Sequence, residues 1–172
     1  MKARYDVDAV VAMSLIRMAA ADRALALWQR PSGERLARLG LDALLAGVDA
    51  PSLRLLAGLG RREYGEAPEL FDRVLEELDL LPLLPEDLRT ARWAAAGWWA
   101  RRIVEREVDP LDGARLIWQE AAAELGYPAA LQPMVELATA IDGSTHASGL
   151  AEGVIATAQH LLDTGTCPAR AV

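Results

Sequence analysis

The sequence predicts an all-α protein, a single compact domain of about eight helices over residues 1–172. Leu and Ala dominate the composition, and β-branched runs that would indicate buried strands are absent. Pro and Gly interrupt the chain at intervals of about ten to twenty residues, which is the spacing of helices joined by short turns. A chain of this length removes roughly 70% of its unfolded surface from water on folding, so one domain needs no disulfide or metal for stability.

The first half of the chain contains four segments with apolar residues at three- and four-residue steps, the period of a helix with one buried face. They lie at about Val7–Trp28, Ser32–Ala46, Ser52–Ala57 and Pro68–Leu80, and the first allows a break near Ala20. Pro31 ends the first segment, and Ser32 can cap the second. Pro51 opens the third segment and Gly58 ends it.

The second half predicts four more helices. One begins at Pro85 and runs through a tryptophan-rich stretch, and the others lie at about Asp109–Leu125, Leu131–Ala140 and Ala147–Asp163. Pro85 and Pro110 occupy first helical positions, where proline is favoured, and Asp109 is the expected cap before Pro110. The tail after about residue 165 is expected to be flexible.

Four of the chain's five tryptophans lie between residues 92 and 118. On a helical wheel, Trp93 and Trp99 share an apolar sector that also holds small alanines, which allow close helix packing. Trp118 continues the apolar face of the next helix. We therefore predict that these three side chains belong to the core.

Trp98 falls on the other side of the same helix, together with Arg101 and Arg102. Since Trp and Arg are enriched at the energetic centres of interfaces, these three residues are predicted to bind a partner. The alternative is that a further helix covers Trp98 and makes it core. The loop GLGRREYGEAP, residues 58–68, is the next candidate surface.

The charge balance excludes some classes of partner. The formal net charge is −7, whereas nucleic-acid binding without sequence preference needs a basic surface. The same acidity disfavours an anionic membrane surface, and no apolar run is long enough to cross a bilayer. Arginine supplies 17 of the 18 basic residues, a bias that suggests a GC-rich bacterial genome. We expect a protein partner, with a basic one favoured by the acidic surface, and a homo-oligomer is a further possibility.

The inventory of reactive side chains is small. The two histidines, His146 and His160, are too isolated to predict a metal site, and no known catalytic or nucleotide-binding motif is present. We therefore assign no catalytic residue and expect no metal and no cofactor. The single cysteine, Cys167, cannot form an internal disulfide, and the N-terminus lacks the pattern of a signal peptide. Both observations predict a cytoplasmic protein.

The segment LDALLAGVDAPSLRLLAG resembles a bacterial helix-turn-helix in its spacing between Ala43 and Leu56. The resemblance implies that Pro51, Ser52 and Arg54 would face the DNA groove, with Arg61 and Arg62 near phosphates. The net acidity and the short second helix favour a packing hairpin instead.

Three stretches, DAPSLRLLAGL, ELFDRVLEELDL and RRIVEREVDPLDGARLIW, are similar to a group of small, all-helical actinobacterial proteins. The resemblance covers roughly residues 40 to 120. It implies a helical fold and transfers no catalytic residue.

Three hypotheses of function follow from the sequence. The first is a non-enzymatic protein that binds another protein, as an adaptor or an immunity-type partner. The second is a helix-turn-helix transcriptional regulator. The third is a helical enzyme or carrier of small-molecule metabolism, with an apolar cavity lined by tryptophans.

Overall fold

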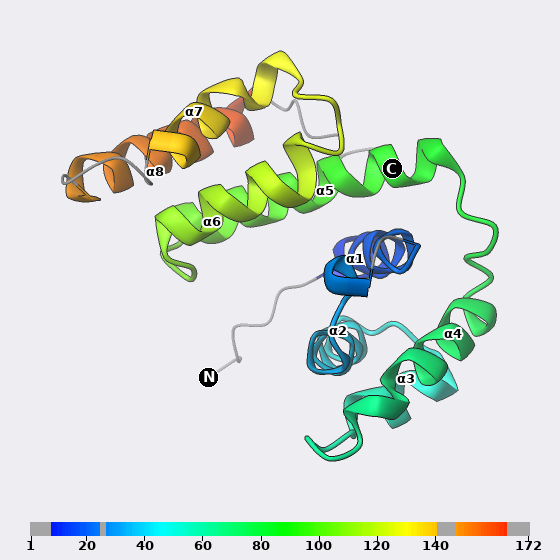
Figure 1. Ribbon diagram of the computed structural model, residues 1–172. Helices are drawn as coiled ribbons and strands as arrows, with labels where there is room; N and C mark the ends of the chain where they lie inside the picture. The colour runs from blue at the N-terminus through cyan, green and yellow to red at the C-terminus, as the bar shows by residue number, and fades with distance from the viewer. Residues whose placement is uncertain (1–7, 25–26, 141–146, 165–172) are drawn as a thin grey trace. The chain divides into compact units, whose positions relative to one another are not determined.

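The structure is a computed structural model that describes residues 8–24, 27–140 and 147–164. Every regular element within these ranges is helical and none is a strand, so the predicted all-α class is confirmed (Figure 1). The described α-helices are α1 (Ala9–Asp22), α2 (Gly33–Leu45), α3 (Pro51–Ala57), α4 (Ala67–Glu77), α5 (Pro85–Val104), α6 (Pro110–Leu116), α7 (Gln132–Ala140) and α8 (Ala147–Asp163). Short 3-10 helices occupy Leu27–Gln29, Tyr64–Glu66 and Ala129–Leu131, and a π-helical segment occupies Ile117–Ala122.

The chain divides into two compact units, residues 1–91 and residues 92–172, and the division falls inside α5. The single domain over residues 1–172 stays a prediction. The tail after residue 165 lies outside the described residues, as do Cys167 and His146.

The first unit is built around α2, which packs against α1, α3 and α4, while α3 also packs against α4. Figure 1 shows α1 and α2 nearly end-on, so their axes run alongside one another. Large side chains from all four helices are almost completely buried and form this core: Ile16, Met18, Leu36, Leu53, Leu56, Phe71 and Val74.

The predicted caps of the α2–α3 hairpin are confirmed. The Ser32 hydroxyl oxygen accepts a hydrogen bond from the Arg35 backbone N–H at 3.2 Å. Gly47 adopts φ 84°, a left-handed conformation that glycine enters without steric cost, and it ends α2. Pro51 begins α3, and Gly58 is its C-terminal cap.

One charged contact ties the end of α1 to α4. The Arg23 guanidinium makes a bidentate ion pair with the Asp72 carboxylate and also donates to the carbonyl oxygen of Pro68. Partial burial, and then the nearby Arg30, lower the pKa of Arg23. An arginine has no accessible neutral form in proteins, so the pair keeps its charge.

The second unit contains the part of α5 after residue 91, α6 with its π-helical continuation, α7 and α8. Gly113 of α6 sits so close to α5 that an added Cβ would lie 2.5 Å from the Ile103 side chain. Figure 1 shows α7 and α8 side by side, and both pack against α6. The buried side chains of α6 to α8 include Ala114, Ile117, Leu131, Met134, Val154, Ala158 and Leu161.

The helix predicted over Val7–Trp28 ends at Asp22, and a separate 3-10 helix follows at Leu27–Gln29. Two other predicted helix ends are wrong, and each has a local cause. The helix predicted to reach Leu80 ends at Glu77, because Asp79 turns into the left-handed region at φ 52° and returns Leu80 to the core. The helix predicted to reach Leu125 keeps α-helical bonding only to Leu116, and then continues as the π-helical segment.

Candidate functional site

The predicted tryptophan surface is mostly buried. Trp98 has an exposed fraction of 9%, close to the 7% of the predicted core residue Trp99, which agrees with the alternative that Trp98 belongs to the core. The Arg102 guanidinium lies 4.9 Å from the centre of the Trp98 ring and 3.6 Å from the Glu107 carboxylate. Of the three predicted partner-binding residues, only Arg101 is fully exposed. A partner-binding role for this group stays a prediction.

The helical wheel separates Trp98 from Trp99, but it does not say whether the side of α5 that holds Trp98 is also covered. In the structure Trp93 and Trp118 are half-buried, whereas nearly every residue from Ala94 to Ala100 is buried. The sequence does indicate that α5 is buried on more than one side. No charged residue interrupts the chain from Trp93 to Ala100, and a helix that is apolar all round is a buried helix.

A second feature of this unit is the buried Arg92, which is 5% exposed. Its guanidinium donates to the carbonyl oxygen of Glu120 at 2.7 Å and lies 3.8 Å from the Glu120 carboxylate. Glu120 belongs to the π-helical segment, where Ala123 N–H donates to the carbonyl of Trp118 five residues earlier. Where a helix changes between α- and π-type bonding, a backbone carbonyl is left without an N–H partner inside the helix. The Arg92 guanidinium supplies a hydrogen bond to such a carbonyl, that of Glu120. Arg92 therefore has a structural task.

The residues of the helix-turn-helix hypothesis are only partly available. Ser52 is 4% exposed, and its hydroxyl and backbone N–H donate to the Glu77 carboxylate at 2.6 and 2.8 Å. Its side chain therefore does not face outward, as a DNA contact requires. Arg54, Arg61 and Arg62 are exposed, and Arg54 lies 3.9 Å from Asp49.

The described residues offer little metal chemistry. No group of three or more His, Cys, Asp or Glu side chains within the described ranges is arranged to hold a metal ion. His160 is exposed on α8, and a site shared with His146 falls outside those ranges. Within the same ranges, no helix has both the length and the apolar character needed to cross a membrane.

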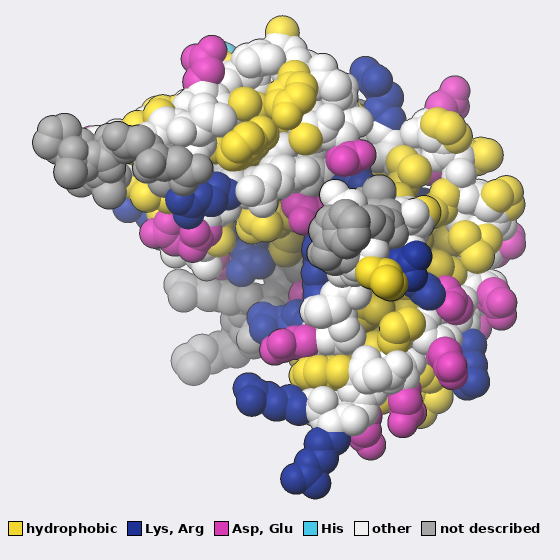
Figure 2. Space-filling view, in the orientation of Figure 1, with side chains coloured by type: hydrophobic (Ala, Val, Ile, Leu, Met, Phe, Trp, Pro, Cys, Tyr) yellow, Lys and Arg dark blue, Asp and Glu magenta, His cyan; other side chains and the backbone are white. Residues whose placement is uncertain are grey.

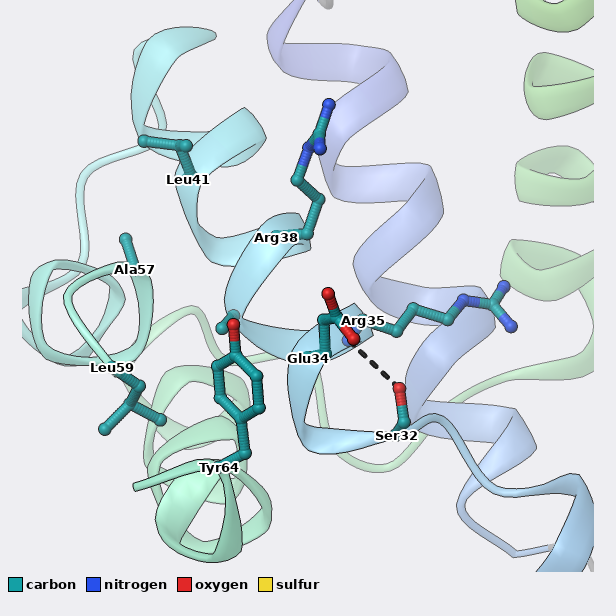
Figure 3. A pocket seen from close by; sticks show the side chains of 9 residues that line it. Ser32, Glu34, Arg35, Arg38, Leu41, Ala57, Leu59 and Tyr64 are labelled. Carbon is teal, nitrogen blue, oxygen red and sulfur yellow. Dashed lines mark hydrogen bonds between the residues drawn. The ribbon is translucent and has the colours of Figure 1, made fainter. Parts of the chain in front are cut away.

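An open groove of about 510 Å³ lies in the first unit, between α2 and the loop that follows α3. We call it the α2 groove, and it is lined by Ser32, Glu34, Arg35, Ala37, Arg38, Leu41, Ala57, Leu59 and Tyr64. Figure 3 shows Leu41, Ala57 and Leu59 on one side of the view and Glu34, Arg35 and Arg38 on the other, with the Tyr64 ring between them. The groove thus has an apolar wall and a charged wall.

Two contacts hold the loop side of the α2 groove in place. A Cβ added to Gly33 would lie 2.1 Å from the backbone oxygen of Tyr64, so the loop packs directly on the first turn of α2. The Glu63 carboxylate accepts from the Gly60 backbone N–H at 2.8 Å, and Glu63 N–H donates to the Gly60 carbonyl at the same distance. These contacts fix the loop side of the groove against the first turn of α2.

Exposed leucines extend the apolar wall along α2. Leu41 is 42% exposed and Leu45 is 53% exposed, and residues four apart lie on the same face of a helix. Figure 2 shows hydrophobic side chains interspersed with both types of charge where Figure 1 draws α2 to α4. Sequence reasoning named the loop as a second candidate surface but did not predict that it would form a groove with α2.

A second open groove, of about 420 Å³, lies between α7 and α8. Small and apolar side chains line it, with His160 as its one ionisable group. In the described parts of the chain, neither of these two grooves is lined by a tryptophan. The tryptophan-lined cavity of the third hypothesis stays a prediction.

Comparison of the chain with models of protein families, with curated proteins and with solved structures finds no match. The function is therefore argued from the geometry of the chain itself.

Proposed function

We propose that this chain is a non-enzymatic, protein-binding protein and that the α2 groove receives its partner. The observation that carries the proposal is a preformed groove with an apolar wall beside the exposed Leu41 and Leu45. An adaptor or an immunity-type inhibitor acts by such an interaction and needs no reactive side chain.

The shape and lining of the groove favour a protein over a small molecule. Sites for small molecules bury most of the ligand and use a few convergent polar groups. The α2 groove is open, and its charged residues Glu34, Arg35 and Arg38 are exposed. A partner protein can cover such a groove and the neighbouring leucines together, and can bury enough apolar area to offset the loss of motional freedom.

The predicted preference for a basic partner does not extend to this surface. Residues 33–66 contain five arginines and five carboxylates, so the formal charge of this segment is zero and the whole excess of −7 lies elsewhere. The acidic surface outside the segment would still speed association with a basic protein.

The proposal is tested with a photo-crosslinking amino acid placed at Leu59, at Arg101 or at Glu152, in cells of the native host. Leu59 lines the groove, Arg101 is the exposed part of the tryptophan surface, and Glu152 is an exposed residue of α8. Photochemistry is preferable to amine-reactive reagents, because Lys2 is the only lysine. We expect one protein to be joined at Leu59 and not at Glu152.

The identified partner is then purified and its affinity measured. Leu59→Asp should weaken binding at least about tenfold, which corresponds to about 1.4 kcal/mol. Leu55→Asp is the matched control, because Leu55 is 58% exposed on α3 and does not line the groove. Cross-linking at Arg101 alone would show that the partner binds at the tryptophan surface and not at the groove. The absence of a cross-linked protein at all three positions would contradict the proposed protein-binding function.

A further inference from the structure

The charges around the α2 groove differ in sign from the charge of the whole chain. Glu34, Arg35 and Arg38 line the groove from α2. Arg61 and Arg62 do not line the groove, but they lie in the loop between two residues that do, Leu59 and Tyr64. Arginines therefore outnumber carboxylates along this rim, although the chain carries a net charge of −7.

Most of the rim arginines are weakly compensated. Arg61 and Arg62 are exposed and make no hydrogen bond or ion pair with any described residue. Arg38 lies 3.9 Å from the Asp42 carboxylate, with 72% of its own side chain exposed, and such surface pairs contribute little. The neighbouring carboxylate of Glu63 is engaged by the Gly60 N–H.

The shape of the groove favours a helix as the occupant. Its α2 wall runs from Ser32 to Leu41, about 14 Å at 1.5 Å per residue, which matches two to three helical turns. A helix can place apolar side chains at i, i+3 or i+4 and i+7 against Leu41, Leu59 and the Tyr64 ring. The alternative, a peptide strand added to a sheet edge, has no template, since the described ranges contain no strand.

We infer that the α2 groove binds an amphipathic helix of the partner protein that carries carboxylates beside its apolar stripe. The apolar stripe packs against Leu41, Leu59 and Tyr64, and the carboxylates pair with Arg38, Arg61 and Arg62. This inference rests on the proposed function and names the chemistry of the partner's docking segment.

The test uses two synthetic amphipathic peptides of about eighteen residues, or five helical turns. Both carry the same leucine stripe, and the flanking positions hold Glu in one peptide and Lys in the other. Binding of each labelled peptide to the full chain is followed by fluorescence anisotropy. The net charge of −7 by itself favours the Lys peptide, so a preference for Glu can arise only from local arginines.

We expect the Glu peptide to bind at least about tenfold more tightly than the Lys peptide at low salt, with the preference shrinking as the salt rises from about 0.05 M to about 0.5 M. The double variant Arg61→Ala/Arg62→Ala should weaken binding of the Glu peptide about threefold to tenfold. Arg54→Ala is the control, since Arg54 is an exposed arginine of the same unit that lies on α3, outside the loop between Leu59 and Tyr64. Leu41→Asp should abolish binding of both peptides.

Three outcomes would overturn the inference: equal or tighter binding of the Lys peptide, an equal loss in Arg54→Ala, and no binding of either peptide. Each leaves the proposed function testable on its own. If a native partner cross-links at Leu59 but neither peptide binds, the groove remains the proposed docking site. The acidic helix is then wrong as its occupant.

Discussion

Adjacent tryptophans on α5 show that the position of a residue on a helical wheel does not by itself decide its exposure. Trp98 and Trp99 point in directions about 100° apart on a helix, yet both are buried, and their ring centres are 6.3 Å apart. Burial of both rings requires neighbours on more than one side of the helix. The sequence of α5 does not say which neighbours are present.

At the residue scale, we predict that Trp98→Ala and Trp99→Ala have similar costs. Each should lower the free energy of unfolding by about 3–5 kcal/mol, because the lost side chain leaves a cavity in a packed interior. Trp118→Ala should cost less, since Trp118 is half-buried. Chemical denaturation followed by circular dichroism measures all three. If Trp98→Ala changed the free energy of unfolding by less than about 1 kcal/mol, Trp98 would be an exposed residue.

At the element scale, α3 begins without a side chain able to cap it. Its N-terminal cap position is Ala50, and the backbone N–H of Ser52 in the first turn is instead satisfied by the Glu77 carboxylate from α4. The same carboxylate also accepts the Ser52 hydroxyl. One residue of α4 thus stabilises the start of α3 and joins the two helices.

We predict that Glu77→Ala lowers the free energy of unfolding by about 1–2 kcal/mol, because it removes this cap and leaves the buried Ser52 hydroxyl without its acceptor. Glu76→Ala, at an exposed neighbouring position with no such contact, should change stability by less than about 0.5 kcal/mol. Urea denaturation of the two variants gives the comparison. Equal effects would show that the charge of the α4 end matters and the cap does not.

The contact of the loop with α2 gives a second prediction at this scale. Gly33→Ala forces its Cβ against the Tyr64 backbone and should cost about 1–3 kcal/mol, because the loop must move. Gly149→Ala is the matched control, since its Cβ meets no atom within 4 Å on α8. Replacing a helical glycine at an open position should stabilise the chain by about 0.5–1 kcal/mol. A lower melting temperature for Gly33→Ala and a higher one for Gly149→Ala would support the close approach of Gly33 to the Tyr64 backbone. A higher melting temperature for Gly33→Ala would contradict it.

At the scale of the whole molecule, the question is whether the two compact units unfold together. Four of the five tryptophans belong to residues 92–172, so tryptophan fluorescence reports mainly on that unit, whereas far-ultraviolet circular dichroism reports on every helix. The prediction of one domain requires the two unfolding curves to coincide. A fluorescence transition displaced from the circular dichroism transition would show two independently stable domains.

The sequence by itself determined the helical class and most helix boundaries, because these depend on local features. Ser32, Pro51 and Gly58 act through their own backbone and the adjacent turn, and the prediction at each position is confirmed. The apolar period likewise placed the buried faces of α2 and α4, which each have a polar side. A helix with one buried face shows that face in its sequence.

Only the tertiary structure decided which residues meet across elements. The Ser52–Glu77 contact spans 25 residues, and the α2 groove joins a helix to a loop that begins more than ten residues after its last turn. The burial of Trp98 likewise depends on neighbours that α5 does not encode. Local patterns fix the backbone through near-neighbour hydrogen bonds and sterics, whereas a groove or a buried ring depends on how separate helices pack. That packing places Leu59 and Tyr64 of the loop in the wall of a candidate binding site.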